Sequence, residues 1–518
     1  MKGNNHITLV RGPVVFTKGS INNEAVPQLG LAYISGYLRA KGYKTTLIDA
    51  SAEGLGKISP LKEYPGYSCQ GLSPSEVISR IPKQTRVIGF TSMFSGEWPV
   101  LRDLIIQTRE SFPETLIVAG GEHITALTEY CLRDCPALDV CVRGEGEHTF
   151  YQLLEAYLEK GNFLDVPGIA YINKTYLNKE SQYQQNGNKP PRMEDIKIPW
   201  PDWPEGYLEK FWGAGKSYGV ATARDMPFML SRGCPFQCTF CSNPQMWTTK
   251  YNFRDLDDVM EEIKYYIKRY DITALQMYDL TAIIKKQWAM EFCHRMIDED
   301  IKLKWSLPDG TRSETLDKEV LSLMKKSDNN YLVYAPESGS QRTLKKIKKR
   351  VKLKRLMDSV IEAKRLGLTV RTNVIIGFPH ETWWDIIQTI LFQMRNAIRG
   401  VDDVTIYIFS PYPGTEIFDD LTSAGKVKLN DDYFLKLTSL NGDYFTTNLT
   451  TFNDNVSGRM LGVVRLVAVL VNYAISYLLY PRRIIRTIRN IYSTKAATVF
   501  EHRLKDLLNR KKLPTNIN

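Results

Sequence analysis

The chain has 518 residues, enough for two to four domains of ordinary size. Its 43% hydrophobic and 24% charged residues exclude a wholly disordered or collagen-like chain, and eight cysteines are too few for a disulfide scaffold. Residues 459–512 contain twelve Lys or Arg and two acidic residues, so they supply ten of the net eleven positive charges. Because this charge belongs to one segment and not to a cleft, we expect no nucleic-acid partner. No secretion signal opens the sequence, which favours the cytoplasm.

Short apolar runs alternate with helical patterns over the first 160 residues. This alternation predicts that residues 1–161 form a doubly wound, Rossmann-like α/β domain with a parallel sheet. Ligands of such sheets bind beyond the carboxyl ends of the strands, where small residues let a large ligand approach. The predicted strands are His6–Val10, Thr45–Asp49, Val87–Ser92, Leu116–Gly120 and Val140–Arg143.

A connector and a second alternating series follow. Residues 162–226 are predicted to be a linker, extended around Ile198–Pro204 because its prolines exclude a helix. Residues 227–415 are predicted to form a partial (β/α)6 barrel of the TIM type, with its chemistry at the C-terminal rim. The six expected barrel strands are Phe228–Arg232, Ala274–Asp279, Leu303–Leu307, Tyr331–Pro336, Val370–Ile376 and Thr405–Phe409.

Residues 416–518 are predicted to be a basic helical region. Leu461–Tyr480 is mostly apolar but contains Arg465 and Asn472, and its uninterrupted part is too short to span a bilayer. In Ile484–Ile491, isoleucines alternate with arginines. Two interpretations stay open: a helical cap on the barrel with its charge solvated, and an amphipathic segment that contacts the membrane surface. The basic run Lys345–Arg355 is predicted to be a solvated helical face, with an anion-binding role as the alternative.

Three cysteines carry the chemistry of the sequence. Cys234, Cys238 and Cys241 have CxxxCxxC spacing, which eight randomly placed cysteines would produce only about twice in a thousand such chains. Closely spaced thiolates favour a soft metal, and a 4Fe-4S cluster is their usual occupant. Three ligands leave one iron open. A structural zinc site would need a fourth Cys or His nearby, and none occurs between Cys241 and Cys293.

This motif, with Phe240 before its last cysteine, resembles the signature of the radical S-adenosylmethionine (SAM) superfamily. The resemblance implies that the three cysteines bind the cluster and that SAM chelates the open iron. A reducing partner of the flavodoxin or ferredoxin type would supply an electron, and SAM would be cleaved to a 5′-deoxyadenosyl radical. Further SAM-binding residues implied by the resemblance are Phe240, Asp279, Glu337, Ser338 and Gly377.

The N-terminal part resembles the cobalamin-binding domain of cobalamin-dependent radical SAM enzymes, through Val118-Ala-Gly-Gly-Glu-His123 and Val142-Arg-Gly-Glu-Gly-Glu147. Cobalamin domains that carry a methyl group use Asp-x-His-x-x-Gly, whose His ligates cobalt. This chain has Asp49-Ala-Ser-Ala-Glu-Gly54 without the His, which fits the radical SAM subclass and also a domain that has lost cobalamin. The cobalamin-binding residues implied by the resemblance are Thr91, Ser92, Gly120, Gly121, Glu122, Gly144 and Glu145.

Two neighbouring features have plainer interpretations. Cys131, Cys135 and Cys141 cluster in sequence, but they straddle a helix end and a strand start, so we expect packing residues. For His123, a capping or core role competes with a place beside the corrin ring.

The resemblance implies methyl transfer to an unactivated carbon. One SAM would methylate cobalamin, a second would give the radical that removes hydrogen from the substrate, and methylcobalamin would donate the methyl group. Two alternatives remain: a ring-forming cyclase or oxidase of the same family, and a non-catalytic cobalamin or redox sensor. The basic, apolar C-terminal region indicates a small-molecule or lipid-like substrate, and a cytoplasmic protein that can lie peripherally on the inner face of the membrane. The sequence identifies no catalytic residue of the chain itself.

Overall fold

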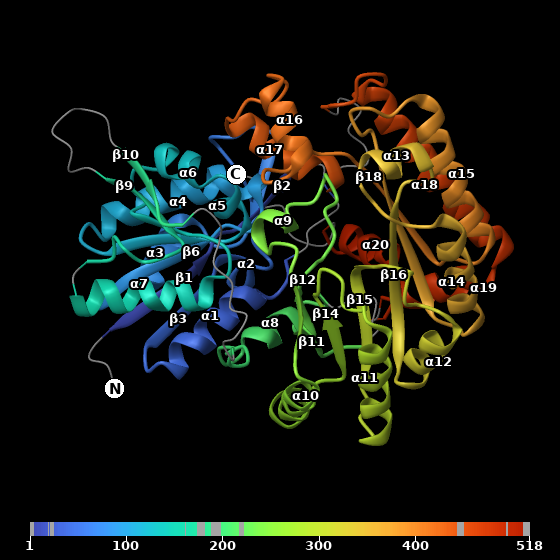
Figure 1. Cartoon of the computed structure of the whole chain (residues 1–518), viewed down its shortest axis with the longest axis horizontal. Coiled ribbons are helices and arrows are strands. Elements are labelled where there is room, and N and C mark those ends of the chain that lie inside the picture. Colours follow the sequence, from blue (N-terminus) through green and yellow to red (C-terminus); the bar gives the residue numbers. More distant parts are fainter. Residues whose placement is uncertain are drawn as a thin grey trace.

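The computed structural model describes residues 5–18, 20, 25–160, 162–173, 182–187, 198–216, 222–442, 450–493 and 496–510. Two sheets stand side by side, each covered by helices, and α18 (Gly458–Leu479) and α19 (Arg482–Ile491) lie on the side of the second sheet that is remote from the first (Figure 1). The predicted class, an α/β protein with a Rossmann-like domain, a barrel and a helical C-terminal region, is confirmed. Parts of the predicted linker (174–181, 188–197 and 217–221) lie outside the described residues.

The N-terminal sheet has seven strands in the order β10-β9-β8-β7-β6-β1-β3. β1 pairs in parallel with β3 on one side and with β6 on the other, so the winding direction reverses between β1 and β6. A reversal of this kind leaves a crevice at the carboxyl ends of the two strands. The strands are β1 (His6–Arg11), β3 (Lys44–Asp49), β6 (Thr85–Thr91), β7 (Leu116–Gly120), β8 (Val140–Val142), β9 (Ile169–Asn173) and β10 (Gln182–Gln185).

Helices cover both faces of this sheet. α3 shows how the sequence sets an end: Ser73 accepts a hydrogen bond from the Glu76 N–H, Glu76 bonds back to the Ser73 N–H, and Pro74 occupies the first helical position. The helices are α1 (Leu29–Ala40), α2 (Ala50–Glu53), α3 (Pro74–Arg80), α4 (Trp98–Ser111), α5 (Glu122–Ala126), α6 (Thr128–Asp134) and α7 (Gly146–Lys160). A short antiparallel sheet of β2 (Val14–Thr17), β5 (Tyr67–Gln70) and β4 (Ile58–Pro60), with the 3-10 turn η1 (Ser95–Glu97), was not predicted.

Residues 198–204 run extended between the two parts of the chain. The Asp202 N–H donates to the Ala32 carbonyl of α1 (2.9 Å), and the Trp200 indole N–H donates to Asp258 of α10 (Leu256–Tyr270) (3.0 Å). The next helix, α8 (Tyr207–Gly213), packs against α2. This strap therefore fastens the first sheet to the barrel.

The second sheet has six parallel strands in chain order, β11-β14-β15-β16-β17-β18, as a partial barrel requires. One predicted strand was wrong: the first barrel strand is Asp225–Phe228, and Ser231–Gly233 forms a separate strand, β12, antiparallel to β13 (Tyr251–Phe253). The chain bends between them because Asp279 accepts the Leu230 N–H (3.0 Å). The other strands are β14 (Ala274–Met277), β15 (Lys304–Thr311), β16 (Asn329–Glu337), β17 (Thr369–Ile376) and β18 (Asp403–Ile408).

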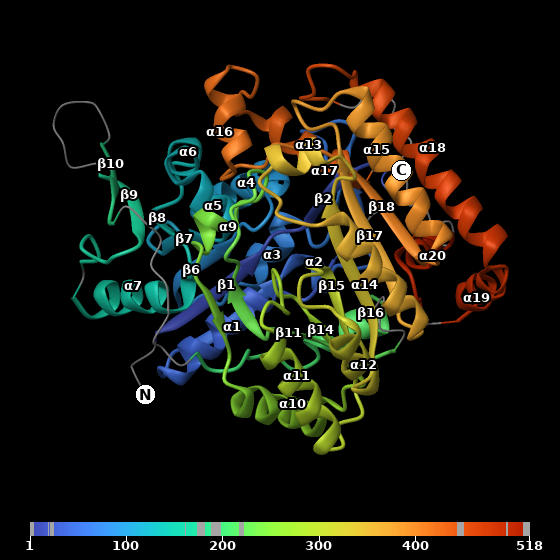
Figure 2. The ribbon, with the colours of Figure 1, turned by 45° about the vertical axis from the view of Figure 1, so that its right-hand side comes forward.

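The barrel helices follow their strands, as Figure 2 shows from the side. Several begin at a side-chain cap, as α10 does at Asp255 and α12 at Asp317. The helices are α9 (Asn243–Met246), α10 (Leu256–Tyr270), α11 (Lys286–Asp298), α12 (Lys318–Lys326), α13 (Gln341–Lys346), α14 (Leu353–Arg365) and α15 (Trp383–Ile398).

The C-terminal helices take two directions. α16 (Glu416–Ser423) and α17 (Asp431–Gly442) return to the N-terminal part, where Asp431 pairs with Arg102 of α4 (2.8 Å). α18 (Gly458–Leu479), α19 (Arg482–Ile491) and α20 (Val499–Arg510) cover the barrel beside β18 and α15. The expectation that a cap would leave its charge solvated holds for the exposed Arg459, Arg482 and Arg489 but not for Arg465 and Arg483, which are buried against the barrel.

Candidate active site between the two sheets

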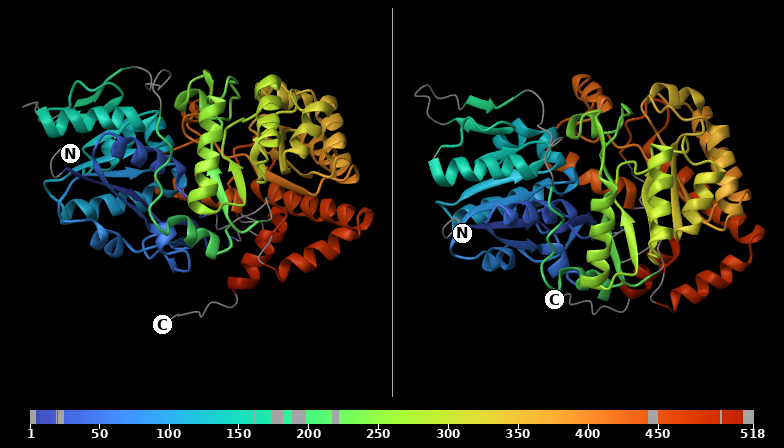
Figure 3. Two further views of the ribbon diagram at one scale, coloured as in Figure 1. Left: turned by 90° about the horizontal axis from the view of Figure 1, so that it is seen from below. Right: turned by 60° about the horizontal axis from the view of Figure 1, so that its bottom comes forward.

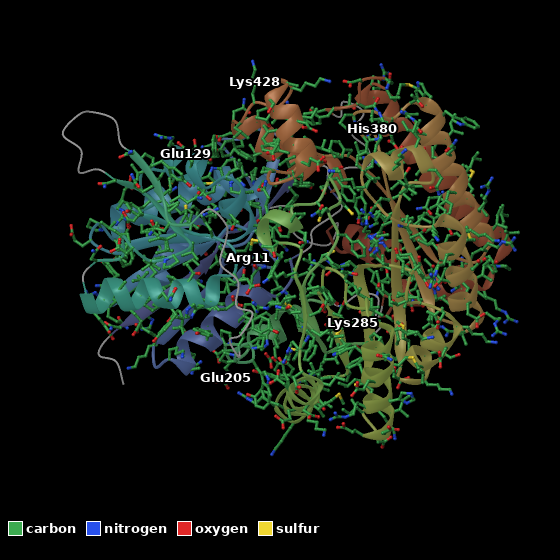
Figure 4. The ribbon with its side chains drawn as sticks, in the orientation of Figure 1. Arg11, Glu129, Glu205, Lys285, His380 and Lys428 are labelled. Atoms are coloured by element: carbon green, nitrogen blue, oxygen red, sulfur yellow. The ribbon has the colours of Figure 1, made fainter. Side chains whose placement is uncertain are left out.

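A cavity of about 640 Å³ lies between the carboxyl ends of the N-terminal strands and the barrel. Arg11 at the end of β1 lies on its wall, near the middle of the molecule (Figure 4). Barrel residues such as Met229, Arg232 and Trp247 form another wall, and Leu437 of α17 also contributes. A mainly apolar cavity of this size with a few polar groups is typical of a cofactor or substrate site.

Backbone forms one edge of this cavity at Gly120 and Gly121, directly after β7. Gly121 has φ +109°, and a Cβ on it would lie 2.5 Å from the Ser92 carbonyl oxygen. The Ser92 N–H in turn donates to the Gly120 carbonyl (2.8 Å). Only glycine fits at this position, so the edge stays open for a large flat ligand.

Six of the seven residues expected to contact cobalamin line the cavity, and Ser92 does not. Ser92 is buried behind the edge, where its backbone fixes the turn. The six lining residues are Thr91, Gly120, Gly121, Glu122, Gly144 and Glu145.

The segment without the expected His is packed away from the cavity. Asp49 caps α2 by accepting the Ser51 and Ala52 N–H groups, and Tyr207 donates its hydroxyl to Asp49 (2.7 Å). Ser51, at the position of the absent His, is fully buried. Among the described residues that line the cavity there is no histidine. The cavity therefore fits a corrin that receives no imidazole from the protein.

The three cysteines of the motif lie in the loop between β12 and α9. Their charges act on one another's pKa, so their sulfurs are neighbours. Within the described residues, no three His, Cys, Asp or Glu side chains are close enough to share a single metal ion. The backbone of Phe236 and of Asn243 lowers the pKa of Cys234 and Cys241, respectively, against the effect of burial. A three-cysteine loop whose backbone favours thiolates fits an iron–sulfur cluster better than one zinc ion.

Two cations face this loop. Burial raises the pKa of Cys234 and Cys238, and the charges of Lys349 and Arg312 act in the opposite direction. The Arg312 guanidinium lies 3.6 Å from the centre of the Phe236 ring. These cations offset part of the negative charge that three thiolates would place in a buried site.

The prediction that residues 345–355 form a solvated helical face was wrong for Lys349. These residues span the end of α13, a turn and the start of α14, and Lys349 lies in the turn. Its Nζ donates to Glu337 Oε1 (2.9 Å), and both side chains are nearly buried. Charge composition alone could not separate this one lysine from its exposed neighbours.

The expected SAM-binding residues divide into two groups. Phe240 packs edge-on against Phe378 (5.7 Å between ring centres), beside Gly377, so these residues form one apolar wall. Gly377 has φ +87° and faces Leu461 of α18, which a Cβ would approach to 2.7 Å. Glu337, with φ +67°, pairs with Lys349 at the end of β16.

The side chains of Asp279 and Ser338 form hydrogen bonds within the protein. Burial raises the pKa of Asp279 to about 6, and its carboxylate accepts the Leu230 N–H (3.0 Å) and the Ser231 hydroxyl (2.5 Å). Ser338 is buried and bonds to Thr389 (2.9 Å). Both side chains therefore stabilise loops around the site.

Side chains that the sequence analysis missed join the two halves of the site. Arg232, two residues before Cys234, forms ion pairs with Glu147 (2.6 Å) and Glu145 (3.8 Å). Ser242, next to Cys241, donates to Glu122. The cysteine loop is thus fastened at one end to the residues that follow β8 and at the other to Glu122, next to the glycine-rich edge. The sequence could have indicated Arg232 and Ser242 only through their position directly beside the cysteine motif.

His123 and the second cysteine group belong to the core. His123 bonds to Ser95 (2.9 Å) and lies 3.4 Å from the Cys131 sulfur, and burial lowers its pKa to about 3. Burial raises the pKa of Cys131, Cys135 and Cys141, so these thiols stay protonated. Neither group is suited to ligate a metal.

Glu381 leads to a testable pH effect. It is fully buried, it accepts the Gly377 N–H (2.7 Å) and the Phe378 N–H (3.1 Å), and burial raises its pKa to about 7. The folded state therefore keeps a proton that the unfolded state releases near its ordinary pKa, so stability falls as pH rises through this range. In the unmodified protein the free energy of unfolding should fall by up to roughly 3 kcal/mol over this pH range because of Glu381, and Glu381→Gln should abolish that part of the fall. Thermal unfolding from about pH 5 to about pH 8 checks it.

The exposed Glu416→Gln is the control, and its pH profile should match that of the unmodified protein. If Glu381→Gln keeps the full pH dependence, the Glu381 carboxyl is not the titrating group.

Residues 228–392 match the Radical SAM superfamily, and residues 23–154 match the B12 binding domain. A cytidylyl-2-hydroxyethylphosphonate methyltransferase from Streptomyces wedmorensis is 30% identical over 68% of this chain and 69% of its own. An anaerobic magnesium-protoporphyrin IX monomethyl ester cyclase from Rubrivivax gelatinosus is 26% identical over 76% and 66%, respectively. The hopanoid C-3 methylase of Methylococcus capsulatus (strain Bath) is 26% identical over 78% and 70%.

Among solved structures, the radical SAM methyltransferase TsrM from Kitasatospora setae superposes with a TM-score of 0.62 at 12% identity, over 94% of this chain and all of that one. A Rossmann-like B12-binding domain before a barrel that carries CxxxCxxC defines a radical SAM enzyme that uses a 4Fe-4S cluster, SAM and cobalamin. The chain belongs to the cobalamin-binding radical SAM family.

Proposed function

We propose that this enzyme transfers a methyl group from SAM to an unactivated carbon of its substrate. One observation carries the proposal: the Glu122–Ser242 hydrogen bond and the Arg232–Glu147 ion pair join the cysteine loop to the ends of β7 and β8, and Glu122, Arg232 and Glu147 line the cavity. A substrate held there would meet the radical-forming half and the methyl-carrying half together, as radical methylation requires.

Different residues of this chain would bind the cluster, SAM and cobalamin. When bound, the cluster, SAM and cobalamin supply electron transfer, hydrogen abstraction and the methyl group. Cys234, Cys238 and Cys241 would bind the cluster, with Lys349 and Arg312 balancing its charge. The cobalamin assignments follow the cavity wall: Thr91, Gly120, Gly121, Glu122, Gly144 and Glu145. Phe240, Gly377 and Glu337 lie outside the residues that line this cavity and are assigned to SAM by the family resemblance. Ser92, Asp279 and Ser338 would act as positioning residues.

Labelled SAM tests this function. The full chain is reconstituted with iron, sulfide and cobalamin under anaerobic conditions, reduced, and given SAM with a fully deuterated methyl group and candidate substrates. The expected product gains one methyl group with three deuterium atoms, and 5′-deoxyadenosine is formed. Deoxyadenosine with an unmethylated, dehydrogenated or oxygenated product would instead identify the cyclase or oxidase alternative.

The cyclase relative keeps that alternative open, because the same cofactors serve both outcomes. The sensor alternative fails if the chain cleaves SAM with only a chemical reductant. It gains support if cobalamin binds and SAM is not consumed.

The substrate we propose is a small molecule or a lipid-like molecule, and the hopanoid methylase relative supports the second class. An electron donor of the flavodoxin or ferredoxin type would supply the reductant. For location we propose the cytoplasm, with peripheral attachment to the inner face of the membrane.

A further inference from the structure

Three neighbouring helices on the outside of the barrel, α15, α18 and α19, expose a concentration of apolar side chains. They pack against one another, at the end of the molecule opposite the seven-stranded sheet (Figures 1 and 2). Figure 3 shows the C-terminal helices from below along the same side of the barrel. Among the described residues, 25 large apolar side chains are exposed; 14 belong to these helices, and Tyr492 directly follows α19. The exposure is therefore localised.

α18 turns its polar side chains inward. Arg465, Asn472 and Ser476 are all buried against the barrel, at helical spacing. The opposite side is apolar along the whole helix, and Leu478 is 81% exposed. The outward side chains are Met460, Val463, Val467, Leu470, Leu478 and Leu479.

α19 has the same inverted arrangement. Arg483 donates to the Val401 carbonyl (2.8 Å), and Arg486 forms ion pairs with Asp402 (3.2 Å) and Glu501 (3.0 Å), all toward the barrel. The isoleucines point outward: Ile484, Ile485 and Ile488.

α15 continues the pattern. Its inward side contains the buried polar residues Asp385, Thr389, Gln393 and Asn396. Its outward side chains include Trp383, Trp384, Ile387, Leu391 and Ile398.

A surface helix in water normally keeps its apolar side chains inward, whereas these three bury several polar side chains and leave many large apolar ones exposed. A contiguous exposed apolar surface of this kind marks an interaction site. α18 has 22 residues and is apolar enough to cross a bilayer by length and composition, but core helices pass the same test. Its inner side packs on β18 and α15, with Leu461 fully buried, so the helix lies against the fold.

The charges around the surface favour an anionic lipid bilayer as its occupant. These helices contain one acidic residue, Asp385, which is buried. Arginine side chains can lay their stems along an apolar surface while their charges reach phosphate groups, and Trp and Tyr favour the same interface. The exposed arginines on or next to the three helices are Arg395, Arg399, Arg459, Arg482 and Arg489.

We propose that α15, α18 and α19 form a docking face that binds the surface of a bilayer containing anionic lipid. The face does not border the cavity between the sheets, so it would anchor the enzyme without itself admitting substrate. The proposal gives a structural basis for the peripheral location proposed above and is independent of the reaction performed.

Vesicle flotation of the full chain tests the docking face. We expect the protein to float with vesicles of equal parts phosphatidylglycerol and phosphatidylcholine, and much less with phosphatidylcholine alone. The double variant Ile485→Asp/Ile488→Asp should lower the partition coefficient at least about tenfold, because two isoleucines lose their transfer free energy. Arg482→Glu/Arg489→Glu should weaken binding to the anionic vesicles only.

Ile361→Asp on α14 is the matched control, since Ile361 is also exposed but lies on a different helix, and its partition should be unchanged. Equal melting temperatures and iron contents show that the variants are folded. No flotation of the unmodified protein, or flotation of the double variant equal to it, would overturn the proposal. So would a dimer in solution that the double variant makes monomeric, because a second copy would then cover the face. Neither SAM nor reductant is present, so a negative result leaves methyl transfer unaffected.

Discussion

Replacing Cys238 by alanine should abolish SAM cleavage, with 5′-deoxyadenosine formation falling at least about a hundredfold, the loss that even an outer partner of a metal ligand can cause. Cys238 lies in the loop that Arg232 and Ser242 fasten to the other half of the site, and the charge of Lys349 opposes the rise that burial causes in its pKa. Two remaining cysteines cannot hold three irons of the cluster in place, so the open iron that binds SAM is lost. Iron and sulfide content and the deoxyadenosine yield measure the effect.

Cys293→Ala is the control, because Cys293 is a buried thiol in α11, remote in sequence from the motif. It should lower stability slightly and leave iron content and SAM cleavage intact. Full SAM cleavage by the Cys238 variant would remove the cluster assignment.

Replacing Gly121 by alanine should remove cobalamin binding while sparing the cluster. The new methyl group would lie 2.5 Å from the Ser92 carbonyl oxygen, and the backbone at φ +109° adds about 1–2 kcal/mol of strain. The edge must therefore move into the cavity that it borders. We expect the cobalt content after reconstitution to fall at least about tenfold, which corresponds to about 1.4 kcal/mol of binding free energy. Iron content should not change.

Gly42→Ala separates strain from the clash. Gly42 has φ +88°, and a Cβ there would meet no atom within 4 Å, so this variant carries the same backbone penalty at a site outside the cavity. It should bind cobalt normally. Equal cobalt loss in both variants would mean that general destabilisation is responsible and that Gly121 does not border the cobalamin site.

Periodicity in the sequence predicts most of the elements, because buried strands and amphipathic helices impose repeating patterns. β7, for example, begins at Leu116 and ends at Gly120 as predicted. The first barrel strand was misplaced because the bend at Leu230 depends on Asp279, which is distant in sequence. The inward side of the C-terminal helices was also unpredictable, since only their partners Asp402 and Glu501 decide where Arg483 and Arg486 point.

In the site, too, local features could be predicted and long-range contacts could not. Cysteines and glycines that are close together in the sequence form recognisable motifs, so the sequence predicts the cysteine loop and the glycine-rich edge. Lys349 and Glu147 act through contacts that the tertiary fold creates, and nothing in their immediate sequence distinguishes them.

α18 begins where the expected adenine-binding loop ends. Leu461, in its first turn, lies against Gly377, and Asn453, just before the helix, donates to the Phe378 and Glu381 carbonyls. A shift of this helix at a bilayer would therefore reach the nucleotide side of the site through direct packing. Thermodynamic reciprocity then fixes the relation between the two events: the factor by which lipid changes the affinity for SAM must equal the factor by which SAM changes the affinity for lipid.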